Sequence, residues 1–492
     1  MVARLDTVAT LDAGMLRGKA GEAVTSWLGV PFAQPPIGPL RFRPPAPVAS
    51  WSGIRSAERL AGAAAQSGFL GRPGQGLGSG VGEDCLYLNV YAPVAAVTDG
   101  PGRPVLVWIH GGAYTSGSGA LYDGRSLAEL GDIVVVTVNY RLGVFGFVDL
   151  ASAVDADVAP NLGIQDQIAA LVWVQGNIAA FGGDPDQVSV AGESAGSVSV
   201  SLLTCAPAAR GLFRAAIMES GSYSLIHGPQ VSQEIARSYA RQLGLGPRDG
   251  HRLWTLPVAQ LLAAQVAVNR WTRGTVPASP WFDGDVVPSS LEAAQAGVRP
   301  DLALLTGHNR DEVTLFQRKP GEILPTRRHD LSVRLRAGLG WDQAETVLDQ
   351  YPETAAGTRA LGTDLNFAMP TQHFAARHSR AGGRTFCYRF DAAVPVLGAT
   401  HASELVYVWQ WSGLTALVLA GRSTPQRRAL GSRMRQHWVS FVRHGSPGPD
   451  WPAYELPGRA VKIFDPVGDR VEPDPSRVRR LAWADQDVMP RA

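Results

Sequence analysis

Cysteine is scarce in this sequence: Cys85, Cys205 and Cys387 are the only three among 492 residues. An odd number of cysteines without paired spacing fits neither a disulfide framework nor a cysteine-based zinc site. Long apolar runs are also missing, because the most apolar stretches have the length of a strand rather than of a membrane span. The first residues lack the apolar core of a signal peptide. We therefore expect a cytoplasmic protein without a membrane partner.

An excess of charge of one sign is missing as well, since 45 basic and 43 acidic residues leave a net charge of +2. This balance gives no strong attraction to nucleic acid, so no nucleic-acid partner is expected. Residues 68–82 are rich in glycine but lack the spacing of a dinucleotide-binding or phosphate-binding loop. We interpret them as a mobile loop and predict no cofactor, no metal, and a monomer or weak homo-oligomer.

What the sequence does contain is an alternation of short apolar stretches with segments of helical periodicity. This alternation predicts an α/β fold, with a large, mostly parallel central sheet and helices on both faces. Turns at Gly14 and Gly18 predict a small antiparallel ribbon at the N-terminus. Without an internal repeat or a clear linker, residues 1–492 are interpreted as a single domain. The predicted strands include residues 105–109, 133–138, 188–191, 215–220, 302–306 and 386–390, and the predicted helices include 165–177, 197–204 and 426–444.

The sequence Gly-Glu-Ser-Ala-Gly, at residues 192–196, joins one of these strands to a helix. This order is that of a nucleophile elbow, in which a serine stands on a sharp turn. Glycines at the flanking positions remove collisions with neighbouring elements, and the helix N-terminus favours a developing negative charge. A tight turn without chemistry is the alternative, and the motif alone does not decide between the two.

A serine nucleophile requires a base, a group that orients the base, and N–H donors for the oxyanion. His401 and Glu312 each follow a predicted strand, in the chain order of serine, acid and histidine. The sequence His-Gly-Gly-Ala, at residues 110–113, follows another strand and is the expected oxyanion loop. Two alternatives stay open here. His401 could be an ordinary loop histidine, and Asp311 could take the place of Glu312.

With these motifs the sequence resembles the type B carboxylesterases, an α/β-hydrolase family that includes bacterial para-nitrobenzyl-type esterases and the cholinesterases. The resemblance covers nearly the whole chain. The shared motifs are Gly29-Val-Pro-Phe-Ala, Leu40-Arg-Phe, Glu83-Asp-Cys-Leu-Tyr-Leu-Asn, Trp108-Ile-His-Gly-Gly-Ala, Asn139-Tyr-Arg, Phe181-Gly-Gly-Asp-Pro, Gly192-Glu-Ser-Ala-Gly, Asn309-Arg-Asp-Glu and Gly398-Ala-Thr-His-x-x-Glu.

The resemblance implies roles for individual residues. Ser194 is the implied nucleophile, His401 the general base and acid, and Glu312 the carboxylate that orients it. The implied oxyanion donors are the N–H groups of Gly112, Ala113 and Ala195. The resemblance also implies two structural ion pairs, Arg41 with Glu83 and Arg141 with Asp166.

Two departures from the family pattern modify this expectation. Ala65 stands where disulfide-bonded members have a cysteine, so Cys85 is expected to be a free, buried thiol. Residues 66–84 contain no tryptophan, whereas cholinesterases place a platform for the choline cation there. The resemblance therefore implies a serine carboxylesterase for uncharged esters of short-to-medium chain length, including aryl esters. The alternatives are an amidase, carbamate hydrolase or lipase of the same fold, or a non-catalytic binding homologue.

Overall fold

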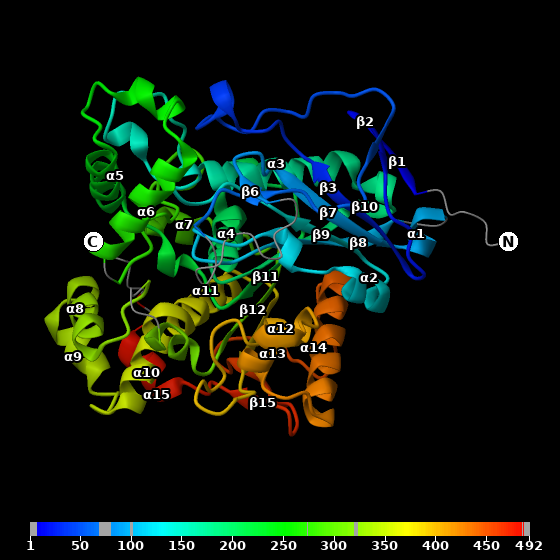
Figure 1. Ribbon diagram of the computed structural model, residues 1–492. Coiled ribbons are helices and arrows are strands. Elements are labelled where there is room, and N and C mark those ends of the chain that lie inside the picture. The colour runs from blue at the N-terminus through cyan, green and yellow to red at the C-terminus, as the bar shows by residue number, and fades with distance from the viewer. Residues whose placement is uncertain are drawn as a thin grey trace.

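The computed structural model describes residues 7–67, 80–98, 102–272, 274–318, 323–484 and 486. Within them, ten strands form one sheet in the order β15-β14-β13-β12-β11-β10-β8-β9-β7-β3 (Figure 1). These strands are β3 (Val24–Pro31), β7 (Tyr87–Pro93), β8 (Arg103–Ile109), β9 (Val134–Val138), β10 (Gly183–Glu193), β11 (Ala215–Glu219), β12 (Ala303–Asn309), β13 (Thr385–Phe390), β14 (Ala460–Phe464) and β15 (Arg470–Pro473).

The sheet is parallel from β9 to β14 and antiparallel only towards its two edges. The mostly parallel sheet predicted from the sequence is thus confirmed. Its central strands are apolar on both faces, as strands covered on both sides must be. In β8, for example, the side chains from Val105 to Ile109 are all buried.

Helices cover both faces of the sheet, as predicted, and alternate residues of β8 show how. Val105, Val107 and Ile109 belong to the core beneath α3 (Leu162–Asn177) and α4 (Ala195–Cys205). Leu106 and Trp108 point the other way, into the core that includes residues of α2 (Arg125–Gly131) and α14 (Pro425–His444). Figure 1 shows α3 above the sheet and α2 and α14 below it.

Further helices lie beyond the end of the sheet at which the predicted site residues gather. One group, α8 to α10, encloses a core of its own with Trp483 of α15. The remaining helices are α1 (Val94–Thr98), α5 (Pro229–Leu243), α6 (Val258–Trp271), α7 (Leu291–Ala296), α8 (Arg328–Leu339), α9 (Trp341–Leu348), α10 (Ala355–Thr363), α11 (Met369–Arg380), α12 (Leu405–Val408), α13 (Gly413–Ala420) and α15 (Arg477–Trp483). No helix in the described part of the chain has both the length and the apolar character needed to cross a bilayer.

The predicted N-terminal ribbon is present as β1 (Val8–Leu11) and β2 (Gly14–Arg17), which pair antiparallel. A third strand, β4 (Ile54–Ser56), joins β2 in parallel. The sequence did not indicate β4, because all three of its residues are exposed and carry no burial pattern.

The glycine-rich segment predicted as a mobile loop falls mostly on residues 68–79, which lie outside the described residues. At its end, however, β6 (Val81–Gly82) pairs with β5 (Ala63–Ala64). The loop prediction is therefore wrong for these last two residues, since a two-residue pairing leaves no periodic signal in a sequence.

Both structural ion pairs implied by the resemblance are formed. Arg41 donates to both carboxylate oxygens of Glu83, at 2.6 Å each, and Arg141 Nη2 lies 2.7 Å from Asp166 Oδ1. Cys85 is a free and buried cysteine, as expected.

Candidate active site

Ser194 occupies the sharp turn between β10 and α4. Its backbone is left-handed, with φ 55° and ψ −122°, which is a strained conformation for a residue with a side chain. The turn is fixed from both sides. The Ser194 N–H donates to the carbonyl of Glu219 at 2.9 Å, and its carbonyl accepts from Val198 N–H at 3.0 Å. The neighbouring parallel strand therefore supports the strained residue through its backbone.

The glycines on either side of Ser194 are required by close contacts. A Cβ atom on Gly192 would lie 2.5 Å from the carbonyl carbon of Gly196. A Cβ atom on Gly196 would collide with the carbonyl oxygen of Ile109, at the end of β8. Any larger residue at either position would push the helix away from the strands, so the motif is needed by the packing of this turn.

His401 and Glu312, which are 89 residues apart in the chain, meet at the same edge of the sheet. The Nδ1 atom of His401 lies 2.7 Å from Oε2 of Glu312. The other oxygen, Oε1, accepts from the backbone N–H of Asn309 at 2.7 Å. Glu312 has no exposed surface, and His401 is 5% exposed. A carboxylate fixed in this way holds the imidazole in one orientation.

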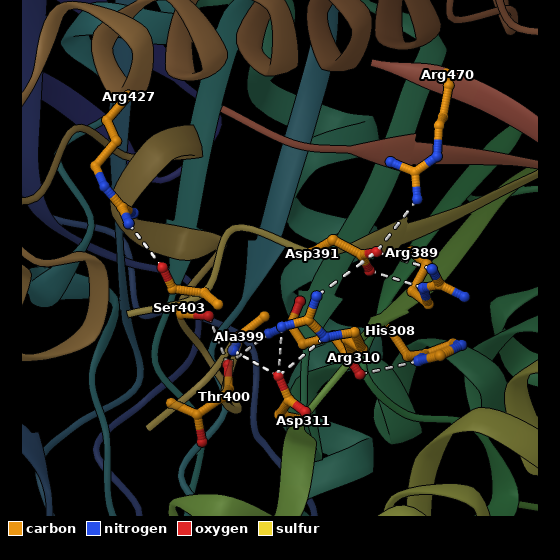
Figure 2. A network of polar contacts seen from close by, with 12 residues as sticks. His308, Arg310, Asp311, Arg389, Asp391, Ala399, Thr400, Ser403, Arg427 and Arg470 are labelled. Atoms are coloured by element: carbon orange, nitrogen blue, oxygen red, sulfur yellow. Dashed lines mark hydrogen bonds and ion pairs between the residues drawn. The ribbon is translucent and has the colours of Figure 1, made fainter. Parts of the chain in front are cut away.

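Asp311, the alternative acid, does not face the imidazole. Its Oδ2 atom accepts from the backbone N–H of Ala399 at 2.9 Å, and its own N–H donates to the carbonyl of Ala399 at the same distance. Figure 2 shows Asp311 between Arg310 and Ala399. The geometry thus favours Glu312 as the partner of His401 and gives Asp311 a different contact, with the backbone of the histidine loop.

The loop that carries His401 is bonded to the end of β12 at successive positions. Asn309 Nδ2 donates to the carbonyl of Thr400 at 2.8 Å. The N–H of His401 donates to the carbonyl of Glu312 at 3.4 Å. Together with the contacts of Asp311, these bonds hold the loop over the end of the strand.

Glu193, which precedes the serine, lies on the other side of the imidazole. Its Oε1 atom is 3.1 Å from His401 Nε2. Among the described residues no hydrogen bond joins the Ser194 hydroxyl to His401. The structure therefore brings His401 and Glu312 into direct contact and places the histidine beside the residue adjacent to Ser194. The role of Glu193 was not predicted, although its position inside the Gly-Glu-Ser-Ala-Gly motif was the available signal.

The two carboxylates change the titration of the histidine. Burial acts to lower the pKa of His401, but the charges of Glu193 and Glu312 and the hydrogen bond to Glu312 outweigh it and raise the pKa. Burial raises the pKa of Glu193 to about 7, against the opposing effect of His401. The protonation of His401 and Glu193 is therefore linked, because each charge stabilises the other.

Two more buried carboxylates, those of Glu219 and Glu404, lie close enough to Glu193 to interact with its charge. Burial raises the pKa of Glu219 to about 8, although the indole N–H of Trp438 donates to its Oε1 at 2.8 Å. Burial also raises the pKa of Glu404, whose Oε2 accepts from Asn309 Nδ2. No set of three or more histidine, cysteine, aspartate or glutamate side chains among the described residues is arranged to hold a metal ion.

The expected oxyanion loop, residues 110–113, lies against the serine turn. A Cβ atom on Gly111 would be 3.1 Å from the Cβ of Ser194. Gly112 and Ala113 have φ angles of 114° and 53°, so the backbone here turns sharply after β8. Ala195 is the first residue of α4 and stands at its N-terminus. The three expected donors thus come from two backbone turns that meet at Ser194.

Aromatic side chains surround the histidine. The ring centroids of Phe316 and Phe367 lie 5.1 and 4.8 Å from that of His401. They pack against the imidazole and limit the access of water to it. Neither residue was singled out in the sequence, because no motif marks them.

Comparison with known proteins agrees with this architecture. The pattern that defines the carboxylesterase family matches residues 5–465. Para-nitrobenzyl esterase of Bacillus subtilis is 36% identical over 488 residues, which cover 96% of this chain and 97% of that protein. Fumonisin B1 esterase of Sphingopyxis macrogoltabida is 32% identical, with 93% and 86% of the two chains covered.

Solved structures give the same result. A thermophilic para-nitrobenzyl esterase superposes with a TM-score of 0.88 at 35% identity, covering 97% of this chain and all of that one. The carboxylesterase Est55 of Geobacillus stearothermophilus gives a TM-score of 0.85 at 35% identity, with the same coverage. These likenesses confirm the predicted α/β-hydrolase fold. The chain belongs to the carboxylesterase family.

Proposed function

We propose that this carboxylic-ester hydrolase acts on uncharged small-molecule esters of short-to-medium chain length, through an acyl-enzyme formed on Ser194. The observation that carries the proposal is the position of His401, held by Glu312 at 2.7 Å and adjacent to the strained serine turn. The relatives named para-nitrobenzyl esterase support esters of aromatic alcohols as substrates. The half-buried ring of Phe316 beside His401 supports them as well, since it can offer apolar contact.

In the proposed acylation step, Ser194 Oγ attacks the ester carbonyl while His401 Nε2 accepts its proton. Glu312 keeps Nδ1 protonated and stabilises the imidazolium that forms. Among the described residues the serine–histidine hydrogen bond is not formed, and such bonds are often long before a substrate is bound. His401 then gives its proton to the leaving alcohol, and the ester bond to the alcohol breaks.

The negative charge of the tetrahedral intermediate is proposed to rest on the N–H groups of Gly112, Ala113 and Ala195. Backbone donors fixed by turns need no reorganisation when the charge develops, and the N-terminus of α4 adds its dipole. In the deacylation step, His401 removes a proton from water. The resulting hydroxide attacks the acyl carbonyl, the bond to Ser194 Oγ breaks, and His401 returns the proton to Oγ as the acid is released.

The nucleophile is tested by Ser194→Ala together with covalent labelling. The variant should keep its melting temperature and lose p-nitrophenyl ester hydrolysis by several orders of magnitude. An organophosphate should attach to one residue, Ser194, as read by peptide mass spectrometry. Activity retained in the variant, or labelling at another residue, would refute the mechanism. Rates with a matched amide and an emulsified triglyceride distinguish the esterase from an amidase or lipase.

A cytoplasmic location and a monomeric or weakly associating state belong to the same proposal. The three free cysteines support a reducing compartment, where thiols persist unpaired. Cell fractionation and analytical ultracentrifugation test these two points.

A further inference from the structure

The short helix α13 (Gly413–Ala420) presents an apolar side to solvent. Leu414, Leu417 and Val418 are 76%, 50% and 48% exposed. Their spacing of three and four residues puts them on one side of the helix. Leu419 and Ala420 are buried and fix the helix to the body of the protein. Three large apolar side chains are therefore held together in water.

The loop before the histidine adds a fourth apolar residue to this surface. Val396 is 78% exposed and has a left-handed backbone with φ 72°, which is rare for a β-branched residue. A Cβ atom on Gly421 would lie 3.2 Å from Val394 Cγ1, so this loop packs beside the C-terminal end of α13.

The sequence that contains the helix is rich in arginine. Residues 405–449 contain six arginines and neither aspartate nor glutamate, although the whole chain carries a net charge of only +2. Arg422, just after α13, and Arg428, in the first turn of α14, are exposed. We call Val396, Leu414, Leu417, Val418, Arg422 and Arg428 the basic–apolar face.

Two carboxylates beside the loop that carries Val396 are already paired with other arginines. Asp391 binds Arg389 at 2.7 Å, and Asp311 binds Arg310 at 3.1 Å (Figure 2). Arg427 is half-buried and donates to the carbonyl of Ala393 at 2.7 Å, which attaches the loop to the start of α14. Among the described residues, neither Arg422 nor Arg428 forms an ion pair, and both remain exposed near α13.

We propose that the basic–apolar face docks the protein onto an anionic lipid surface. Apolar side chains on one side of a helix enter the boundary between headgroups and acyl chains, and arginines beside them attract anionic headgroups. A second copy of the chain fits less well, because a twofold contact would bring Arg422 and Arg428 against their own copies. The missing long apolar runs led to the expectation of no membrane partner, and the proposed contact is peripheral and spans nothing. The proposal does not depend on the assignment of the catalytic residues.

Sedimentation with vesicles tests the proposal on the full chain. Sucrose-loaded vesicles of phosphatidylcholine alone are compared with vesicles containing about one quarter phosphatidylglycerol, at low and high salt. The protein should sediment with the anionic vesicles at low salt, be released by high salt, and remain in the supernatant with phosphatidylcholine.

Two pairs of substitutions separate the apolar and the charged contribution. Leu414→Gln with Leu417→Gln should lower partitioning at least about tenfold. Arg422→Gln with Arg428→Gln should lower it about thirtyfold on anionic vesicles. The control is Val172→Gln with Val467→Gln, at sites 53% and 95% exposed elsewhere on the protein, which should bind as the wild type does. Hydrolysis of a soluble p-nitrophenyl ester should be unchanged in all three.

The wild type remaining in the supernatant with anionic vesicles overturns the proposal. Equal binding by the wild type and both substituted pairs also overturns it, because lipid contact would then lie elsewhere. If Leu414→Gln with Leu417→Gln instead abolishes a dimer seen by ultracentrifugation, without a change in lipid binding, the face is a contact between two copies.

Discussion

The imidazole of His401 contacts a carboxylate at each of its nitrogen atoms, and the two carboxylates differ in their surroundings. Glu312 accepts a hydrogen bond from the backbone N–H of Asn309 and lies in the short turn that follows β12. Glu193 belongs to the serine turn, and burial raises its pKa to about 7. We therefore expect Glu312 to orient the ring, and Glu193 to influence the nitrogen that is proposed to accept the proton of Ser194.

Substitution of Glu193 by glutamine should move the acidic limb of the kcat/KM profile to lower pH. The charge of Glu193 favours the imidazolium, so its removal lowers the pKa of His401, and His401 must be neutral to accept a proton. The measurement is hydrolysis of p-nitrophenyl butyrate across a pH series from about 5 to about 9. Glu234→Gln, at an exposed position on α5, should leave the profile unchanged. A limb that moves to higher pH would contradict the proposed role of His401.

Replacing Glu312 or its neighbour Asp311 by the corresponding amide should lower kcat to very different extents. Glu312→Gln leaves the shape of the side chain but removes the charge that orients His401, and kcat should fall about a thousandfold or more. Asp311→Asn should cost less than about tenfold, because the contact of Asp311 is with the backbone of Ala399. Both variants should keep the wild-type circular dichroism spectrum. If their order in kcat is reversed, the wrong carboxylate has been assigned to the histidine.

Secondary structure elements with a strong apolar pattern were predicted from the sequence. Very short elements without such a pattern were not. The strand at residues 105–109 and the helix at 426–444 correspond to β8 and α14 within two residues. The strand predicted at 302–306 continues to Asn309, because pairing of Gly307, His308 and Asn309 with β13 overrides their low strand propensity. Elements of two or three residues, such as β4 and β6, depend on contacts that no periodicity records.

The segment that follows the oxyanion loop is held in place by a side chain distant from it in sequence, that of Gln66. Gln66 accepts from Gly117 N–H at 3.0 Å and donates to the Gly117 carbonyl at 2.9 Å, both within the protein interior. Gln66→Leu leaves two buried backbone groups without partners and should lower the stability by about 1–3 kcal/mol. It should also reduce kcat about tenfold or more with little change in KM, since the oxyanion donors are displaced.

The matched control for this substitution is Gln175→Leu. Gln175 Nε2 donates to the carbonyls of Pro185 and Leu212, at 2.8 and 3.0 Å, on the side of α3 away from the serine turn. A similar loss of stability with an unchanged kcat is expected, as read by thermal unfolding and p-nitrophenyl ester hydrolysis. Equal losses of kcat in the two variants would show that destabilisation alone, rather than the oxyanion loop, is responsible.

At the scale of the whole molecule, the sequence indicated the sheet and the order of the site residues but not the contacts between them. Motifs placed His401 and Glu312 after strands, and parallel strands bring such positions to one edge. The contact of Glu193 with His401 depends on side-chain rotation, which no spacing encodes. The roles of Ser194, His401 and Glu312 and the single domain over residues 1–492 stay predictions.

A positive charge on the substrate should not increase kcat/KM. Residues 66–84 contain seven glycines and no tryptophan, so we expect no broad aromatic platform for a quaternary ammonium from this segment. Such a contact contributes on the order of 1–2 kcal/mol, or about tenfold in kcat/KM. Butyrylthiocholine should therefore have a lower kcat/KM than a neutral thioester with the same acyl group. A clear preference for the choline substrate in this pair would contradict the prediction.

The three unpaired cysteines have a practical consequence for that measurement. Cys85 and Cys387 are buried, and burial raises the pKa of the half-buried Cys205 to about 12. Disulfide exchange requires a thiolate, so these sulfurs react slowly with the chromogenic disulfides used to count free thiols. The colour that develops during thioester turnover should then arise from the released product. The folded protein should therefore contribute little background colour to the assay. Small differences in rate between thioesters can then be measured without subtracting a signal from the protein's own thiols.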